Sequence, residues 1–204
     1  MLRGLVLAPV VCHTKRVNKA TPSGLPTVTQ LSQDVATGFQ LLIEEGDTRE
    51  IGKFLAFTTE KVIAPRWLSD ACGIETVSAP DDEEGQQPKY DLQAKSGLRI
   101  QIKFRGGKTL HMEQTRRTTG KNAGAGAKNG QVRYSVDSFD VILFVIPTDY
   151  ADPTSWEYLA IPAEELEDPN MPGFCVGNVP AAVRKRYAGK AQALISTLNE
   201  IASI

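Results

Sequence analysis

Cysteine and long apolar runs are scarce in this chain, and acidic residues are scarce in its middle. The three cysteines, Cys12, Cys72 and Cys175, are odd in number and widely spaced, which indicates free thiols in a reducing cytoplasm and no zinc site. No apolar run approaches the length of a membrane-spanning helix, so no membrane partner is expected. Pro9 interrupts the apolar start and basic residues follow closely, so we expect an N-terminal strand or arm and not a signal peptide. These absences together predict a cytoplasmic protein.

Acidic residues are nearly absent from residues 95–133. That segment holds ten lysines and arginines and a single acid, Glu113, whereas the rest of the chain holds thirteen basic and twenty-three acidic residues. The formal net charge of the whole chain is only -1. A near-neutral protein with its positive charge concentrated in one segment is built to meet a polyanion there. Nucleic acid is the obvious candidate.

Helices are predicted before and after this segment. Residues 29–45 show one apolar stripe, and a second helix starts at Asp47 with an inward stripe that continues until Pro65 ends or kinks it. Residues 66–72 add a turn of helix. A single C-terminal helix is predicted from about Pro180, with apolar residues on one side and basic residues on the other.

The remaining apolar segments predict strands. Residues 139–146 are almost continuously apolar, which is typical of a strand covered on both faces. A further strand is predicted over 156–161, followed by a helix start at 162–166. The order of helices, hairpin, strands and helix predicts an α/β fold with a mixed β-sheet flanked by helices. The length suits one domain, so residues 1–204 are expected to form a single unit.

Residues 89–105 are the stretch around which this fold is organised, and they predict one β-hairpin. From Leu98 to Arg105 apolar and polar residues alternate without exception, the period of a strand with one buried face. Lys95-Ser96-Gly97 supplies a three-residue turn, in which glycine takes the left-handed position.

The loop length sets the register of the hairpin. It places Leu92 opposite Ile100, so that the apolar side chains of both strands share one face. Asp91 then lies across from Gln101, and Lys103 follows on the same side because residues two apart in a strand point the same way. A two-residue loop would put Asp91 opposite Ile100 and mix the faces, so the hydrophobic pattern favours the first register.

Asp91, a gap of nine residues and then Gln101-x-Lys103, followed by an apolar strand, resemble the signature of the PD-(D/E)xK nuclease superfamily. The resemblance covers roughly residues 47–166 and implies a restriction-endonuclease-like core, with an N-terminal helical arm and a C-terminal helix. The superfamily includes type II restriction endonucleases, junction resolvases and repair nucleases. The chain departs from the usual pattern in two places. Pro88 lies three residues before the aspartate instead of directly before it, and Gln101 stands where an acid is usual.

The resemblance implies a magnesium site in the hairpin. Asp91 would be the main ligand, Gln101 would offer a neutral amide oxygen, and the backbone carbonyl of Ile102 would complete the protein's share. Lys103 would orient the attacking water and neutralise charge in the transition state.

Glu50 is expected to add a further carboxylate from the preceding helix, as an acid there does in many relatives. An equally good interpretation makes Glu50 a capping-box partner of Asp47. Glu60 is the poorer candidate, because the helical pattern points it away from the apolar stripe.

The basic segment after the hairpin is the expected DNA-binding surface. Arg99 and Arg105 share the face of Lys103 with only Asp91 as an acidic partner, although an exposed face with ordinary cross-strand ion pairs is the alternative. Residues 118–129 are rich in glycine and predict a mobile basic loop. The residues expected to bind DNA are Arg99, Arg105, Lys108, Arg116, Arg117, Lys121, Asn122, Lys128 and Arg133.

The function expected from these features is magnesium-dependent, sequence-specific cleavage of double-stranded DNA. A small type II restriction enzyme acting as a homodimer fits best, because a two-fold protein matches a palindromic site. Two alternatives remain open. One is a nucleic-acid-binding module of the same fold without activity, and the other is a junction-resolving or repair nuclease.

Overall fold

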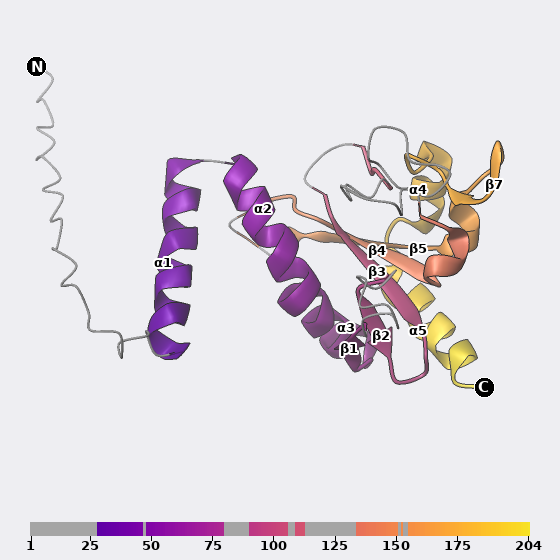
Figure 1. The fold of residues 1–204 in the computed structure, drawn as a ribbon, viewed down its shortest axis with the longest axis horizontal. Helices are drawn as coiled ribbons and strands as arrows, with labels where there is room; N and C mark the ends of the chain where they lie inside the picture. The colour runs from indigo at the N-terminus through magenta and orange to yellow at the C-terminus, as the bar shows by residue number, and fades with distance from the viewer. Residues whose placement is uncertain are drawn as a thin grey trace, which may run out of the picture. The chain divides into compact units, whose positions relative to one another are not determined.

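The computed structural model describes residues 28–46, 48–79, 90–105, 109–112, 134–150, 152 and 155–204 (Figure 1). The chain divides into two units, residues 1–38 and residues 39–204. The described part of the first unit is the beginning of one helix, and every strand lies in the second unit. The expectation of a single nuclease-like domain stays a prediction.

The helices before the sheet follow their sequence pattern, with one irregular turn. Helix α1 spans Val28–Glu45, as predicted, and Gly46 follows it at a φ of 70°. Helix α2 spans Thr48–Thr58, a π-helical turn (η1) spans Thr59–Ile63, and helix α3 spans Ala64–Cys72. All three segments form one helical region.

Pro65 does not end this region, which continues through the further turn of helix predicted over residues 66–72, and the irregular turn lies just before Pro65. The backbone N–H of Ala64 bonds to the carbonyl of Thr59, five residues back, which is the π-helical pattern. Pro65 therefore falls in the first turn of α3, where a missing N–H costs little. The helix ends instead at Gly73, whose left-handed conformation lets its N–H reach the carbonyls of Leu68 and Ser69.

A mixed sheet of five strands in sequential order, β1 to β5, forms the centre of the second unit. The strands are β1 (Thr76–Ser78), β2 (Leu92–Ala94), β3 (Arg99–Phe104), β4 (Val141–Ile146) and β5 (Glu157–Pro162). Strands β3 and β4 are parallel, and the other neighbours are antiparallel. Every residue of β4 is buried, as predicted for a strand covered on both faces.

Each face of the sheet has its own apolar core. On one face, residues from α2, α3 and α5 pack on the strands, with Leu55, Leu68 and Ile195 among them. On the other face, Phe139 and Phe144 pack with residues from the segments that follow β5. Figure 1 shows strands β2 to β5 lying between α2–α3 on one side and β7 on the other. The α/β class, with helices flanking a mixed sheet, is confirmed.

The C-terminal part departs from its prediction. The expected helix start after β5 is a 3-10 turn, η4 (Ala163–Leu166), and a small hairpin follows, β6 (Glu167–Asp168) and β7 (Met171–Cys175). The single C-terminal helix is two helices, α4 (Ala181–Tyr187) and α5 (Ala191–Ala202). They are separated where Gly189 adopts a φ of 70°, a conformation that a continuous helix does not contain.

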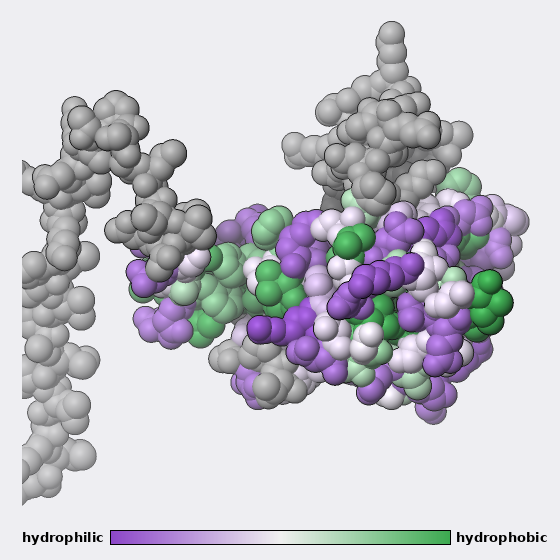
Figure 2. Space-filling view, turned by 90° about the horizontal axis from the view of Figure 1, so that it is seen from below, coloured by the Kyte–Doolittle hydropathy of each residue, from purple (hydrophilic) through white to green (hydrophobic). Residues whose placement is uncertain are grey.

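The surface of the described residues is mostly polar. In the space-filling view of Figure 2, hydrophobic residues form separate small patches between hydrophilic ones on the face that is shown. Scattered patches of this size are normal for a protein surface. Within the described ranges, no helix combines the length and apolar character needed to cross a membrane.

Candidate active site

The hairpin has the predicted register. Leu92 pairs with Ile100, and the turn closes with hydrogen bonds from Ala94 N–H to the Leu98 carbonyl and from Gly97 N–H to the Ala94 carbonyl. Gly97 has a φ of 95°, the left-handed region that the loop requires. Strand β2 begins only at Leu92, and Asp91 lies directly before it, with its backbone N–H still bonded to the Ile100 carbonyl at 3.1 Å.

The side chain of Asp91 replaces the missing strand partner. Its Oδ2 accepts a 2.7 Å hydrogen bond from the backbone N–H of Ile102. The same oxygen accepts a hydrogen bond from the side-chain nitrogen of Gln101. The three residues expected to form the metal site are therefore in direct contact.

Gln101 is buried, and its amide nitrogen is directed at the Asp91 carboxylate. That nitrogen also donates to the carbonyl of Ile102 at 3.2 Å. It thus bridges two of the oxygens expected as metal ligands, the Asp91 carboxylate and the Ile102 carbonyl. A cation held by these two oxygens would need the amide to turn, so that its oxygen faces the cation instead of its nitrogen.

Glu60 lies close to this group, contrary to the sequence expectation. Burial raises the pKa of Glu60, the negative charge of Asp91 raises it further, and the charges of Lys103 and Lys61 lower it. The expectation overlooked that Glu60 follows directly after the buried Thr59, at the edge of the buried face. Glu60 lies in the π-helical turn, which packs against β3.

Glu50 has a different environment. It lies in the first turn of α2, and its Oε1 is 2.6 Å from the ammonium of Lys53. Its side chain is 43% exposed. A metal-binding role for Glu50 stays a prediction, and Glu60 is the glutamate with an electrostatic link to Asp91.

Burial and the neighbouring charges have opposite effects on the pKa of Asp91. Burial raises the pKa of Asp91, and the hydrogen bond from Ile102 and the charges of Lys103 and Lys61 oppose that shift. Two half-buried or buried carboxylates near one another are costly without a cation between them. Carboxylate, amide and carbonyl oxygens are the ligands that magnesium prefers, so the donor set fits this metal. The described residues contain no group of three or more His, Cys, Asp or Glu placed to hold a metal, so neutral oxygens would have to complete the set.

Lys103 is positioned by the sheet and by an aromatic ring. It lies beside Phe144 of β4, and its ammonium is 5.0 Å from the centre of the Tyr134 ring. A cation over an aromatic face is stabilised by the ring's quadrupole. Sequence reasoning missed Tyr134 and Lys61. Nothing in the spacing of Tyr134 signals the contact, whereas Lys61 could have been inferred from its place beside Glu60.

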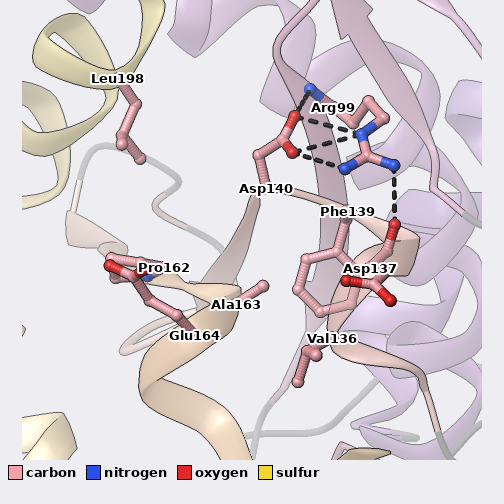
Figure 3. A pocket seen from close by; sticks show the side chains of 9 residues that line it. All are labelled: Arg99, Val136, Asp137, Phe139, Asp140, Pro162, Ala163, Glu164 and Leu198. Atoms are coloured by element: carbon pink, nitrogen blue, oxygen red, sulfur yellow. Dashed lines mark hydrogen bonds and ion pairs between the residues drawn. The ribbon is translucent and has the colours of Figure 1, made fainter. Parts of the chain in front are cut away.

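Arg99 forms an ion pair and hydrogen bonds within the protein. The expectation that Asp91 is the only acidic partner on its face was therefore wrong. Its guanidinium lies 2.6 Å from Asp140 and donates to the carbonyl of Asp137 at 2.7 Å. Asp140 also accepts from the Arg99 backbone N–H at 2.7 Å. Figure 3 shows this pair at a pocket of about 310 Å³. The lining of that pocket includes neither Asp91 nor Lys103.

Arg105 likewise donates to backbone carbonyls. Its guanidinium reaches the carbonyl of His111 at 3.2 Å and that of Phe104 at 3.1 Å. Burial lowers its pKa. These contacts hold residues 111–112 against the end of β3, which is a structural role. The other residues expected to bind DNA lie outside the described residues: Lys108, Arg116, Arg117, Lys121, Asn122, Lys128 and Arg133.

Comparison with known proteins gives no family for this chain. No protein-family model matches it, and a search of curated proteins finds no match. The interpretation of the site therefore rests on its own residues and their geometry.

Proposed function

We propose that this protein is a magnesium-dependent nuclease that hydrolyses phosphodiester bonds in DNA. The observation that carries the proposal is the direct contact of Asp91 with Gln101 and Ile102, with Glu60 and Lys103 near enough to shift the pKa of Asp91 or to be shifted by it. A phosphodiester carries negative charge that increases towards the transition state, so its cleavage needs oxygen ligands for a cation and a positive side chain nearby. This site has both.

Each residue has a role in that reaction. Asp91 and Glu60 would hold magnesium, with oxygens from Gln101 and Ile102, and the metal would supply Lewis acidity to the scissile phosphate. Lys103 would donate a hydrogen bond to the attacking water or the phosphate and neutralise the developing charge. The ring of Tyr134 and the neighbouring carboxylates hold its ammonium in place. Lys61 adds a second positive charge at the same site.

Double-stranded DNA, site-specific type II cleavage and a homodimer form the narrower part of the proposal. They are supported by the sequence, through the basic segment at residues 95–133 and the superfamily resemblance. A magnesium site with few carboxylates would bind its metal weakly until a DNA phosphate adds an oxygen.

One observation favours a second candidate, a nucleic-acid-binding module without activity. The Gln101 nitrogen donates to Asp91, so the amide in its present orientation opposes a cation. A protein in which the Gln101 amide keeps this orientation would retain the fold but would not bind the magnesium that cleavage needs.

The test is to incubate the protein with plasmid and phage DNA in magnesium or in chelator, beside the Lys103→Ala variant. Discrete fragments in magnesium from the wild-type protein alone would support site-specific cleavage. A smear would support a non-specific nuclease. DNA left intact with magnesium and manganese would overturn the nuclease proposal and favour the binding module.

A further inference from the structure

One face of the helical region from α2 to α3 carries positive charge at regular intervals. Arg49, Lys53, Lys61 and Arg66 are all exposed on it, and Phe57 lies in the middle. We call these five residues the α2–α3 basic face. The opposite side of the same helical region is buried against the sheet and includes Ile51, Leu55 and Leu68.

The helix geometry places these residues in one row. Arg49, Lys53 and Phe57 follow one another at intervals of four on α2, so they lie on one face of that helix, and Lys61 follows four residues later in the π-helical turn. The π-helical turn widens the next interval to five, which brings Arg66 onto the row in place of the half-buried Pro65. The row is about 25 Å long, at a rise of about 1.5 Å per residue.

Phe57 is an unusual member of a charged face. Its side chain is 67% exposed, although a phenylalanine normally contributes its area to a core. One turn before it lies Lys53 and one turn after it lies Lys61. An exposed ring between two cations is the arrangement that binds a nucleobase, with phosphates on either side.

The charges on this face are only partly neutralised within the protein. Lys53 pairs with Glu50 at 2.6 Å, an exposed pair that is worth little and is easily exchanged for a phosphate. Across the described ranges, neither Lys61 nor Arg66 forms an ion pair with a carboxylate. Lys61 also adjoins Glu60 in the chain, and its charge lowers the pKa of both Glu60 and Asp91, so the row passes near the candidate active site.

We propose that the α2–α3 basic face binds a single-stranded stretch of the nucleic acid substrate, with one unpaired base stacked on Phe57. The inference rests on the proposed nuclease function and narrows its substrate to DNA with an unpaired strand beside the cleavage site. The bases of an intact duplex are already stacked on each other, so a ring on a convex helix cannot reach their faces. An unpaired strand offers both its bases and its phosphates, which match the ring and the cations.

The experiment measures binding in chelator, where no cleavage occurs. Fluorescence anisotropy would be recorded with a labelled single strand, a blunt duplex of the same sequence and a duplex with a single-stranded flap. The variants are Phe57→Ala and Phe57→Trp. The matched control is Ile201→Ala, which removes a hydrophobic side chain of similar exposure, 60%, from α5. Thermal unfolding of each variant checks that it is folded.

We expect Phe57→Ala to weaken binding of the single strand and the flap roughly 5- to 150-fold, the loss of one base–aromatic stack. Phe57→Trp should restore this affinity, and Ile201→Ala should leave it unchanged. Binding of the blunt duplex should be equal in all four proteins. Equal affinity of Phe57→Ala and the wild type for the single strand would overturn the proposal, as would an equal loss on all three probes or no binding of any probe.

Salt dependence gives a second readout. Arg66→Ala should lower the slope of log affinity against log salt for the single strand by about 0.7, the value for one phosphate contact. An unchanged slope would show that Arg66 makes no phosphate contact and does not belong to the binding face. Lys185→Ala, an exposed lysine of α4, serves as the control for a basic residue elsewhere.

Failure of the nuclease proposal and failure of the single-strand proposal give different results in these experiments. If the flap is bound through Phe57 but magnesium produces no cleavage, the nuclease proposal fails and the binding face stands. If magnesium produces cleavage of blunt duplex and flap alike, with no effect of Phe57→Ala on either, the nuclease stands and the single-strand face fails.

Discussion

The backbone N–H of Ile102 donates a 2.7 Å hydrogen bond to the carboxylate of Asp91, at the point where β3 continues and β2 has ended. A side chain therefore does what the next residue of a strand would do. Gln101, a residue of β3, donates to the same carboxylate, and Glu60 and Asp91 interact electrostatically. Asp91 thus both completes the sheet and supplies the main negative charge of the site.

Asp91→Asn separates these two roles. The asparagine oxygen can still accept from Ile102, but it brings no charge for a cation. We expect DNA cleavage to fall by roughly 100-fold or more, while the apo protein becomes more stable at neutral pH. The measurements are cleavage of labelled DNA in magnesium and urea unfolding in chelator, with Asp70→Asn on the exposed side of α3 as the control.

The gain in stability should depend on pH. Burial raises the pKa of Asp91 above its value in the unfolded chain, so this contribution to stability is complete below the unfolded pKa and is lost as pH rises through the folded pKa. The stability difference between Asp91→Asn and wild type should be small near pH 4, around the unfolded pKa, and should grow towards neutral pH. A constant difference across this range would contradict the assignment of burial as the main cause.

Glu60→Gln and Glu50→Gln distinguish the two candidate carboxylates. If Glu60 holds the metal, its variant should lose most of the stabilisation that magnesium or manganese gives to the wild type, because the ligand-linked rise in Tm depends on affinity. Glu50→Gln should lose only its exposed pair with Lys53, about 0.5 kcal/mol or less. The reverse result would return the role to Glu50.

Metal affinity itself should rise with pH. Protons compete with the cation for Asp91 and Glu60, and both have raised pKa values. Calorimetric titration of manganese into the protein at several pH values, with Glu60→Gln beside it, would show a steeper pH dependence for the wild type. Equal slopes would mean that Glu60 does not bind the metal.

Gln101→Glu should bind metal more tightly than the wild type. The glutamate removes the amide nitrogen that bridges Asp91 and Ile102 and replaces it with a ligand oxygen. Without metal, the added carboxylate should destabilise the protein by repelling Asp91. The Tm in chelator should therefore fall while the Tm shift on adding magnesium increases. Gln93→Glu, in the neighbouring strand, should show neither effect.

Lys103→Ala should abolish cleavage with little effect on DNA affinity. It removes one positive charge among many, so binding should weaken only slightly, whereas loss of a group that acts in the transition state costs roughly 100- to 10,000-fold in rate. Lys95→Ala, which removes an exposed lysine paired with Glu75, is the control. Turnover of Lys103→Ala near the wild-type rate would show that the motif has been assigned wrongly.

Arg99 should prove structural. A double-mutant cycle of Arg99→Ala and Asp140→Ala should give a coupling energy of about 1 kcal/mol, the upper range for a partly exposed pair. DNA affinity of Arg99→Ala should match the wild type, because the guanidinium is already held by Asp140 and Asp137. A large loss of affinity would restore the DNA-binding role that the sequence indicated.

The parts that the sequence predicted well are those in which a repeating pattern meets a steric requirement. The period of two from Leu98 to Arg105, together with the glycine in the turn, defined the register and brought Asp91, Gln101 and Ile102 together. The unbroken apolar run of β4 indicated burial on both faces. Both are local rules that the rest of the chain does not override.

The parts that were missed depend on contacts between distant segments. The π-helical turn has no signature in the apolar pattern, and nothing in that pattern connects Glu60 with Asp91. The partner of Arg99 is Asp140, 41 residues away, and no spacing rule connects them. Strand β1 has only three residues, too few to show alternation, and forms because β2 offers an edge.

The π-helical turn at Thr59–Ile63 holds one residue more than a regular α-helical turn and keeps α2 and α3 in phase, because the interval of five from Thr59 to Ala64 closes a turn that four residues close in an α-helix. Deleting one residue within this turn should therefore restore a regular α-helix and leave Leu68 in the core and Arg66 in solvent. A one-residue deletion in the middle of α2 has no extra residue to absorb it, so it would rotate the parts before and after it by about 100° relative to each other. Such a deletion in α2 should be tolerated far less than the same deletion in the π-helical turn.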